Sequence, residues 1–447
     1  MKRRLIWPVL ATVIILLSVA WFVYPCYPGF GVFTPQFVYE AVRFNQLAFI
    51  VIGPIAVFIT GLIWKLIWPV LATVIILLSV AWFVYPCHLP PEFGVFPPHF
   101  VDDALDLWAF IVIGLGAVYI TGLILFPKLY GFKGAIPGPK PDKKPLPWWF
   151  YTGLAVNLFF WWLMWSHSEL FGDLVYWSPI PICCGFIFVL DGIVYHRNNG
   201  VSLFSSKRKL LLISAIVSVG GWTYFAFYDY FVPVLGNWYY PNVWSHTILR
   251  IEFLVLYSTI TPALFQWYLL LNTFPNLPAR YKNGPKWKIN GNVLLLIGAI
   301  LIGAMVLLPY PVFWVMWIGP FAMMTGMLLN LKIWNPFKDI ARGDWSAGVL
   351  IGVASLIHGF LVEFWNFGSH FFAPDSPTNP NYSVYKIPYV NVIHVFSEMS
   401  LLGYIGYIPF GILVWQVFIW SGKLFGFDTN IALDSNQVKD EGTVVCV

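Results

Sequence analysis

The sequence predicts an all-α, polytopic integral membrane protein that crosses the bilayer about twelve times. Only 10% of its 447 residues are charged, against about 25% in soluble proteins. Apolar runs of about 20 residues, the length of a membrane-spanning helix, recur along the whole chain. The basic residues fall almost entirely in alternate connections between these runs, which is the pattern that the positive-inside rule describes.

Twelve apolar runs are long enough for a transmembrane helix. They lie at 5–24, 46–64, 66–85, 107–126, 148–165, 178–195, 209–228, 247–271, 292–309, 312–331, 346–367 and 390–420. The last run exceeds the length of a perpendicular helix and contains Pro409. We therefore expect it to tilt, to kink or to extend beyond the bilayer.

The first run could be taken for a secretory signal peptide, because Lys2, Arg3 and Arg4 precede it. The run is longer than the usual apolar core of a signal peptide, and no small-x-small cleavage site follows it. The same run also recurs inside the chain, where no signal peptide can act. We therefore expect a transmembrane helix.

An internal duplication accounts for the first part of the chain. Residues 5–26 recur without change at 66–87, and the similarity continues through the next loop and the second helix. Residues 1–64 and 65–126 are therefore predicted to be two copies of one transmembrane hairpin. A recent duplication or an artefact in the assembly of the sequence would both produce this identity, and the differences between the two loops favour duplication.

The remainder of the chain divides into four parts. Residues 127–147 are rich in proline and lysine and are expected to form a cytoplasmic linker close to anionic lipid. Two groups of four helices follow, repeat A at 148–273 and repeat B at 274–423. The polar residues 424–447 are expected to form a flexible cytoplasmic tail.

The distribution of basic residues predicts the orientation. Of the 25 lysines and arginines, all except Arg43, Arg250 and Lys386 fall on the side of the N-terminus. Because basic loops stay in the cytoplasm, both termini are predicted to be cytoplasmic. We expect a multi-pass protein of the cell membrane, as in the inner membrane of a bacterium.

Repeats A and B share an order of acid, aromatic loop, acid and proline. In repeat A this order is Asp229, NWYYP (237–241), Glu252 and Pro262; in repeat B it is Glu363, SVYKIP (383–388), Glu398 and Pro409. Four helices in each half give both copies the same orientation in the membrane, which makes this a parallel repeat rather than an inverted one.

The four acids lie near the predicted outer ends of their helices, among aromatic residues. Because charged groups in a membrane are costly, they are usually functional or paired. The sequence therefore predicts a cavity at the depth of the outer leaflet. Its candidate catalytic acids are Glu363, Glu398, Asp229 and Glu252. Its candidate ligand-binding residues are Arg250, Trp238, Tyr240, Trp365 and Tyr385.

The alternative is that these residues have only structural roles at the membrane surface. Tryptophan and tyrosine gather at membrane surfaces in any case, and acids at helix N-termini stabilise the helix dipole. Glu252 and Glu398, near predicted helix starts, suit that role. Asp229 and Glu363, near predicted helix ends, do not suit it.

Metal and cofactor signals are weak. His394 and Glu398 are four residues apart and would share a helix face, and Glu363 with His358 or His370 could complete a site. The sequence has no ExxH or HxxxH pair and no CxxC spacing, so no metal site is predicted and the three histidines are weak candidates. No phosphate loop or nucleotide fingerprint occurs, and the sequence identifies no cofactor.

Two resemblances follow from these motifs. LDGIVYHRNNGVSL (190–203), DYFVPVLGNWYYP (229–241), EFWNF (363–367) and SEMSLLGYIGYIPF (397–410) resemble an uncharacterised family of bacterial polytopic membrane proteins, which implies a multi-pass fold but no activity. The repeated acid–aromatic–acid order is distantly similar to membrane lycopene cyclase domains.

That second resemblance implies acid-initiated cyclisation of an isoprenoid in an aromatic-walled pocket. Glu252 and Glu398 would then correspond to the family's P-x-E-E motif. The chain departs from this motif, because neither residue is followed by a second Glu and no P-x-E precedes them.

Three functions remain open. The chain could bind or transform a lipophilic, isoprenoid- or carotenoid-like ligand, or serve as an accessory or scaffold subunit of a pigment- or electron-transfer-type membrane complex. It could also be a transporter or channel, although the inner half offers mainly Asp191, Asn330 and Thr325. The expected partners are the lipid bilayer, a lipophilic ligand or pigment and other membrane subunits, not nucleic acid. Whether the chain is an enzyme stays open.

Overall fold

The chain is described by a computed structural model, and the helical class that the sequence predicts is confirmed. The residues that the structure describes are 103–235, 238–242, 246–307, 314–372, 379–385, 390, 393–394 and 397–433. The first hairpin copy, the first helix of the second copy and residues 434–447 lie outside the described residues, so the duplication at 5–26 and 66–87 stays a prediction.

Nine long helices form the described part of the chain. They are α4 (Asp103–Leu125), α5 (Trp148–Ser166), α6 (Pro179–Arg197), α8 (Arg208–Leu235), α9 (His246–Asn272), α11 (Gly291–Leu307), α12 (Val315–Asn330), α14 (Ser346–Phe371) and α15 (Tyr407–Phe425). The short elements are η5 (Pro127–Tyr130), η6 (Glu169–Trp177), α7 (Leu203–Ser206), α10 (Asn276–Arg280), α13 (Pro336–Ile340), η7 (Gly403–Gly406), β1 (Trp238–Tyr239) and β2 (Val384–Tyr385). Each apolar run predicted after residue 106 overlaps one long helix.

Four segments of the described chain are long and apolar enough to cross a membrane: Pro179–Arg197, Ile251–Asn272, Ser346–Phe371 and Gly403–Phe425. Shorter apolar helices lie at Phe110–Leu125, Gly291–Ala304 and Val315–Asn330. A helix rises about 1.5 Å per residue, so about 20 residues cover the hydrocarbon layer. These segments indicate a membrane protein.

The last apolar run, predicted as one helix over 390–420, is helical only in its second part. The described residues before Gly403 are irregular, and α15 begins at Tyr407. Pro409 therefore lies in the first turn of α15, where its missing N–H is not needed. Serine side chains replace part of the helical hydrogen bonding upstream: the Gly403 N–H donates to Ser400 Oγ at 3.2 Å.

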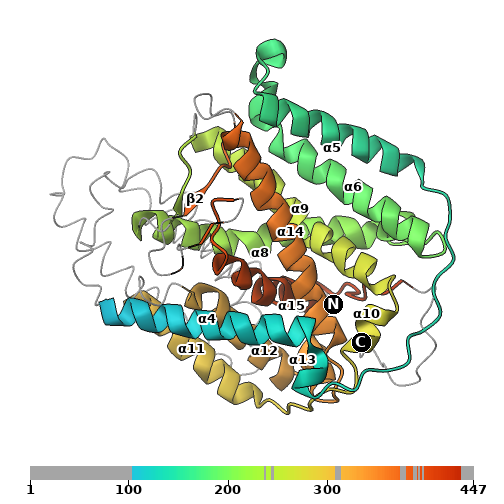
Figure 1. Ribbon diagram of the computed structural model, residues 1–447, viewed down its shortest axis with the longest axis vertical. Coiled ribbons are helices and arrows are strands. Elements are labelled where there is room, and N and C mark those ends of the chain that lie inside the picture. The colour runs from blue at the N-terminus through green and yellow to red at the C-terminus, as the bar shows by residue number, and fades with distance from the viewer. Residues whose placement is uncertain are drawn as a thin grey trace, which may run out of the picture.

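Neighbouring helices pair, and α14 crosses the middle of the assembly (Figure 1). α5 packs on α6, α8 on α9, α11 on α12, and α14 on α15. α9 joins the pairs because it also packs on α6 and α14, while α12 packs on α15. β1 and β2 pair antiparallel, with Trp238 opposite Tyr385 and Tyr239 opposite Val384.

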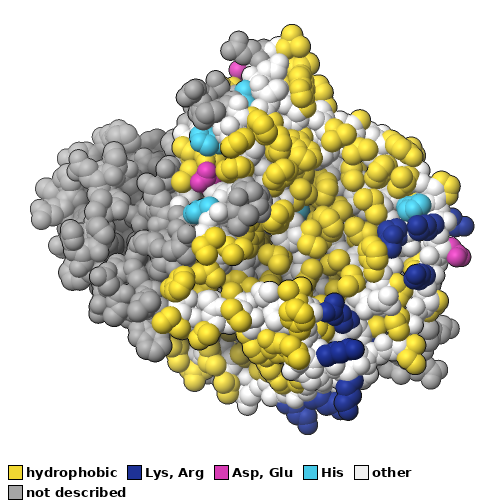
Figure 2. All heavy atoms as spheres, in the orientation of Figure 1, with side chains coloured by type: hydrophobic (Ala, Val, Ile, Leu, Met, Phe, Trp, Pro, Cys, Tyr) yellow, Lys and Arg dark blue, Asp and Glu magenta, His cyan; other side chains and the backbone are white. Residues whose placement is uncertain are grey.

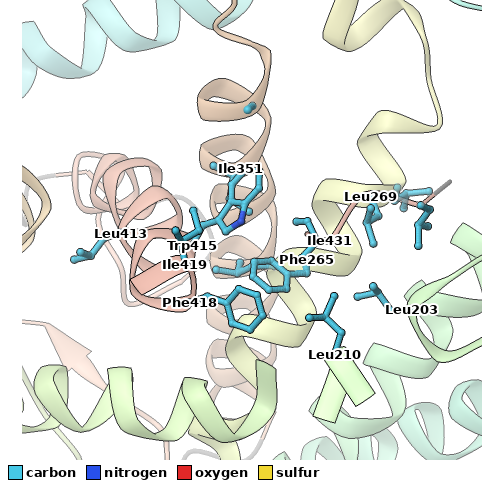
Figure 3. Close-up of a cluster of buried hydrophobic side chains, with 14 of the residues drawn as sticks. Leu203, Leu210, Phe265, Leu269, Ile351, Leu413, Trp415, Phe418, Ile419 and Ile431 are labelled. Atoms are coloured by element: carbon cyan, nitrogen blue, oxygen red, sulfur yellow. The ribbon is translucent and has the colours of Figure 1, made fainter. Parts of the chain in front are cut away.

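The main core lies where α9, α14 and α15 meet (Figure 3). Phe265 of α9 and Phe418 of α15 are both fully buried, with ring centroids 5.0 Å apart. Ile431 and Leu433, which the sequence assigns to a flexible tail, are buried in the same core. Residues 426–433 thus pack on the bundle.

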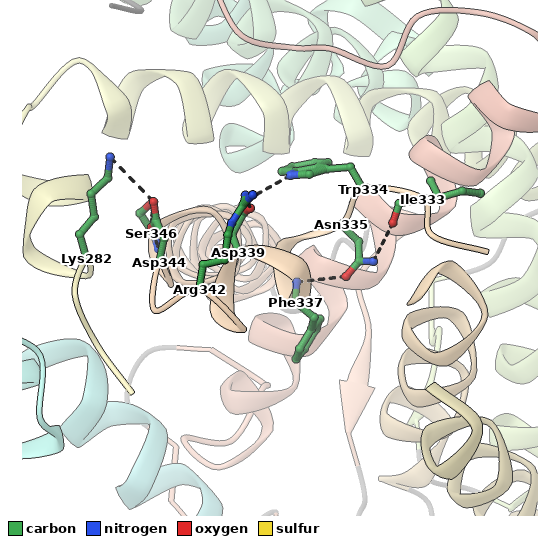
Figure 4. A network of polar contacts seen from close by, with 9 residues as sticks. All are labelled: Lys282, Ile333, Trp334, Asn335, Phe337, Asp339, Arg342, Asp344 and Ser346. Atoms are coloured by element: carbon green, nitrogen blue, oxygen red, sulfur yellow. Dashed lines mark hydrogen bonds and ion pairs between the residues drawn. The ribbon is translucent and has the colours of Figure 1, made fainter. Parts of the chain in front are cut away.

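One end of the molecule is basic. Figure 2 shows lysine and arginine side chains gathered on one side of the visible face, with most of the visible histidines on the other side. At the basic end, Asp339 accepts from Trp334 Nε1 at 3.1 Å and pairs with Arg342, and Asp344 pairs with Lys282 at 3.8 Å (Figure 4). Burial raises the pKa of Asp339, and Arg342 partly offsets that rise.

The linker is bound to both halves at this basic end. The N–H groups of Lys133 and Gly134 donate to the loop at 282–283, at 3.2 and 3.0 Å. Further along, the Lys144 N–H donates to His196 O at 2.9 Å. The linker therefore follows a defined path from the loop at 282–283 to the end of α6.

Asp191 is the most fully hydrogen-bonded acid of the described chain. Its side chain is 0% exposed. Its carboxyl accepts from Trp149 Nε1 at 3.1 Å, Ser202 Oγ at 2.7 Å, the Phe204 N–H at 2.9 Å and Gln266 Nε2 at 2.6 Å. These donors come from α5, the start of α7 and α9. Asp191 thus ties three elements to α6.

Replacing this carboxyl should destabilise the bundle. In Asp191→Asn, an NH₂ group faces donors, so at least two buried hydrogen bonds are lost, at a cost of about 3 kcal/mol. Heat denaturation in detergent should show an unfolding temperature several degrees lower. Asp428→Asn changes an exposed acid at the same end and should leave it unchanged. Equal effects of the two variants would contradict this account of Asp191.

Candidate functional site

A buried carboxyl lies where α14, β2 and α15 meet. Glu363 is 3% exposed and sits about two turns before the end of α14. Its Oε1 accepts from Tyr385 Oη at 2.8 Å and from Tyr407 Oη at 3.0 Å. An uncompensated buried carboxyl costs several kcal/mol. The two tyrosine hydroxyls therefore compensate part of the cost of burying this acid.

Local structure explains why these tyrosines reach Glu363. A Cβ on Gly359, one turn before Glu363, would lie 2.5 Å from the Tyr407 ring, so only glycine lets that ring pack against α14. Small residues of this kind let membrane helices approach closely. Tyr385 is held from the other side, because its backbone pairs with Trp238 in the β1–β2 ladder.

Glu398 is half-buried and lies in a bend, not in a helix. Its Oε1 accepts from Tyr382 Oη at 2.5 Å, and the ring of His370 stacks on Tyr382 with centroids 4.5 Å apart. The Glu363 and Glu398 carboxyls are close enough to interact electrostatically. We refer to Glu363, Glu398, Tyr382, Tyr385 and Tyr407 as the acid–tyrosine cluster.

The prediction that His394 and Glu398 share one face of a helix is wrong. Both residues lie in the irregular segment before α15, and the exposed His394 has its Nδ1 3.3 Å from Ser397 O. The serines and glycines of this segment do not sustain a helix, because their side chains and neighbours satisfy the backbone locally. The weak candidate metal site that depended on that helix face therefore has no structural support.

Glu252 is a third acid at this end of the molecule, and it is 0% exposed. Neither of its carboxyl oxygens makes a hydrogen bond of ordinary geometry within the described residues. The side chain of Asn381 lies beside it, and Cys183 of α6 lies near enough to interact with it electrostatically. From the sequence, Glu252 could serve only to stabilise the dipole at the start of a helix. That role does not require burial, and Glu252 is completely buried.

One short segment, 379–385, contacts all three acids. Asn381 lies beside Glu252, Tyr382 binds Glu398 and Tyr385 binds Glu363. Asn379 anchors the segment to the end of α14, because its Nδ2 donates to Asn366 Oδ1 at 2.9 Å and to Ser369 Oγ at 3.1 Å. Segment 379–385, in the connection between α14 and α15, therefore brings the three acids together.

The electrostatics of the cluster favour neutral tyrosines. Burial raises the pKa of Tyr385 well above its ordinary value, and the Glu363 carboxyl raises it further. Within the described residues, neither of the two ion pairs involves Glu252, Glu363 or Glu398. The cluster can therefore hold, donate or accept a proton at a carboxyl flanked by tyrosine hydroxyls.

Trp365 is buried but faces away from the cluster. Its ring lies 6.0 Å from Trp161 of α5 and 5.3 Å from Phe186 of α6. Beyond it, an open groove of about 470 Å³ is lined by Trp161, Trp162 and Trp165 together with Phe372. The predicted aromatic wall is thus divided between the acid–tyrosine cluster and this tryptophan groove.

The other predicted residues have varied surroundings. Tyr240 follows β1, contacts Phe253 at 5.1 Å between ring centroids and interacts electrostatically with Tyr385 and Tyr407. His358 is buried within α14. Asp229 lies in α8, Arg250 in α9 and Trp238 in β1, and the positions of these three side chains lie outside what the structure describes.

Several contributors were not predicted from the sequence. Tyr382, Tyr407 and Asn381 reach the acids only because distant segments come together. The available signal was the spacing of Gly359 and Glu363, four residues apart on one helix face, which leaves room for a ring beside an acid. No group of three metal-ligating side chains converges within the described part of the chain.

The fold and the site define an all-helical membrane protein with buried carboxyls beneath a short connecting segment. Comparisons with protein-family models, with curated proteins and with solved structures found no match.

Removing either tyrosine hydroxyl should destabilise the protein, because the buried Glu363 carboxyl then loses one hydrogen bond. Tyr385→Phe and Tyr407→Phe each delete one hydrogen bond to the carboxyl, so each should lower the free energy of unfolding by about 1–3 kcal/mol. Denaturation in mixed micelles measures this loss. Tyr151→Phe, at a ring 58% exposed, is the control and should change stability by less than about 0.5 kcal/mol. Stability losses no larger than the control's would contradict the role of the hydroxyls.

Proposed function

We propose that this protein binds a lipophilic, isoprenoid-like molecule at the acid–tyrosine cluster and performs acid–base chemistry on it there. The observation that carries the proposal is the buried Glu363 carboxyl, held by Tyr385 and Tyr407 in an apolar helix bundle. Buried acids inside membrane helices are usually functional. A buried, hydrogen-bonded carboxyl is also the group that acid-initiated chemistry requires.

The chemistry would run as follows. The O–H bond of the Glu363 carboxylic acid breaks, and its proton adds to one carbon of a C=C bond. The cation left on the other carbon is attacked by a second double bond, and the tyrosine rings stabilise the positive charge. Loss of a proton from an adjacent carbon to a carboxylate restores a neutral alkene. The sequence consumes no oxidant or reductant. The order of acid, aromatic loop and acid, which resembles that of membrane lycopene cyclase domains, would imply the same reaction type.

The chain is further proposed to span the cell membrane twelve times with both termini in the cytoplasm. The spans found by length and composition support a multi-pass arrangement. The separation of lysine and arginine from most of the histidines on the visible face supports the orientation (Figure 2).

A parallel repeat of four helices plus four helices is part of the same proposal. The first pair of each half packs in the same way: a Cβ on Gly153 would lie 2.6 Å from Gly185 O, and one on Gly298 would lie 2.8 Å from Gly319 O. A twofold axis along the membrane normal would also exchange β1 with β2, and the antiparallel pairing of these strands is consistent with that symmetry.

A second candidate function is an accessory subunit of a larger membrane complex. The tryptophan groove and the apolar face of α4 favour it, because Leu115 and Val118 are 66% and 72% exposed and could pack against a partner helix. Transport is supported less well. Asp191 has its hydrogen bonds satisfied, and Thr325 accepts from Gln416 at 2.8 Å, so these inner polar groups serve helix packing.

Gentle purification tests the ligand. The wild-type protein should carry an isoprenoid-like molecule, identified by its absorption spectrum and by mass spectrometry. Glu363→Gln removes the proton donor. The amount of that molecule that co-purifies, or the ratio of its substrate and product forms, should therefore change by at least about tenfold. Asp173→Asn, at an exposed acid, is the matched control. Wild-type protein that carries only bulk lipid would refute the proposal, and co-purifying subunits instead would favour the accessory role.

Site-directed labelling tests the orientation. In a cysteine-free background, a cysteine at Asp173 should react with a membrane-impermeant maleimide on intact cells. A cysteine at Lys140, in the linker, should react only after the membrane is opened, because the positive-inside rule puts the linker in the cytoplasm. The reverse pattern would overturn the orientation.

A further inference from the structure

Two segments that are far apart in the sequence form one surface at the basic end of the molecule. They are residues 126–136, which follow α4, and residues 282–288, which precede α11. The hydrogen bonds from the N–H groups of Lys133 and Gly134 join them, and Asn283 Nδ2 adds a third bond to Gly134 O at 2.7 Å. The two segments therefore lie side by side.

Aromatic packing fixes this surface to the core. Phe132 is 3% exposed, and its ring centroid lies 5.5 Å from that of Trp345. Trp287 packs on the same Trp345 ring with centroids 4.7 Å apart, and Trp345 Nε1 donates to Pro285 O at 2.8 Å. A Cβ on Gly284 would overlap the Phe132 ring, so glycine is needed for this close approach. The surface is thus held in place by the fold itself.

Four exposed lysines of this surface, which we call the lysine platform, carry charge that nearby acids do not balance. They are Lys128, Lys133, Lys286 and Lys288. Residues 126–140 and 276–290 contain no Asp or Glu. Within the described part of the chain, the amino groups of the platform make no ion pair. The platform is therefore a site of concentrated positive charge.

Other cations at this end of the molecule are engaged with the protein. Asp344 pairs with Lys282, and Asp339 pairs with Arg342. Lys207 Nζ donates to two backbone oxygens that follow α15, at 2.9 and 2.6 Å. These cations have a structural role in the fold, which the lysines of the platform lack.

The platform flanks two apolar helices. Lys128 follows the end of α4 by three residues, and Lys288 precedes the start of α11 by three residues. Lysines in such positions lie among the lipid head groups of a membrane. Beside them, Leu129 is 82% exposed and Ile136 is 96% exposed. Apolar side chains next to lysines are typical of surfaces that rest on the boundary between head groups and acyl chains.

We propose that the lysine platform binds the phosphate head groups of anionic phospholipids, while Leu129 and Ile136 contact their acyl chains. Phosphate oxygens only accept hydrogen bonds, and each ammonium group offers three donors. A soluble phosphate would leave the two apolar side chains in water, so a lipid is the better partner. The inference rests on the proposed spans of α4 and α11, but not on the ligand or the chemistry proposed for Glu363.

Two lipids with identical acyl chains, phosphatidylglycerol and phosphatidylcholine, test this inference. Their binding to the full-length protein in detergent is measured by native mass spectrometry. The wild-type protein should bind phosphatidylglycerol at least about tenfold more tightly, because several lysines near one anionic group add their attractions. Equal binding of the two lipids would overturn the inference.

A pair of variants separates the platform from the net charge of the protein. The platform variant changes all four platform lysines to Gln and should reduce the preference to about twofold or less. Its control changes four exposed lysines outside the platform to Gln: Lys140, Lys143, Lys209 and Lys423. The control has the same net charge but should keep the preference. Equal losses in the two variants would overturn the proposed site.

A third variant distinguishes a lipid from a soluble anion. Changing Leu129 and Ile136 together to Ser should weaken the binding of phosphatidylglycerol at least about threefold, because apolar contact area is lost. An excess of inorganic phosphate should not displace the lipid from the wild-type protein. Unchanged lipid binding in the variant, or displacement by phosphate, would contradict the acyl-chain contacts.

Heat denaturation shows that the variants stay folded. All the substituted side chains are exposed, so the unfolding temperatures should match that of the wild-type protein. Loss of phospholipid preference in a folded platform variant that still carries its isoprenoid-like molecule would support both proposals separately. Equal binding of the two phospholipids would refute the platform alone, because the acid–tyrosine cluster shares no residue with it.

Discussion

The burial of carboxyl groups inside an apolar helix bundle is the constraint on which the rest of the structure depends. Water is excluded from such a bundle, so each acid must find its donors within the chain. Glu363 finds two tyrosine hydroxyls, and these come from β2 and from the start of α15. The β1–β2 ladder and the close contact at Gly359 hold those tyrosines in reach.

Three buried acids of the described residues differ in how their carboxyl groups are hydrogen-bonded. Asp191 accepts four hydrogen bonds and ties α5, α7 and α9 to α6. Glu363 accepts at one oxygen from two tyrosine hydroxyls, and Glu252 lies beside the side chain of Asn381. A buried acid with only a structural role is expected to have all its hydrogen bonds formed, because an unpaired carboxyl oxygen lowers stability. Within the described residues, Glu252 and Glu363 both lie against segment 379–385, which carries Asn381 and Tyr385 to them.

The helical class and the positions of most described helices follow from the sequence, because each run of apolar residues long enough to span a bilayer has one favourable backbone structure. The final run shows the limit of that argument. The run at 390–420 is apolar in sequence, but in its described residues before Gly403 the side chains of Ser397 and Ser400 make local hydrogen bonds that compete with the helical ones. An apolar stretch that is buried against protein need not be helical, and hydropathy cannot detect that difference.

The sequence by itself determined the helical class and identified Glu363 as an acid within an apolar run, because hydropathy and spacing are properties of short stretches. Only the tertiary structure decided which groups meet. Tyr382 and Tyr407 reach acids 16 and 44 residues away, Asn381 reaches Glu252 across more than a hundred positions, and Trp365 turns toward α5 and α6 instead of the cluster. Such contacts depend on how helices cross and on where glycine permits close approach, and no local pattern carries that information.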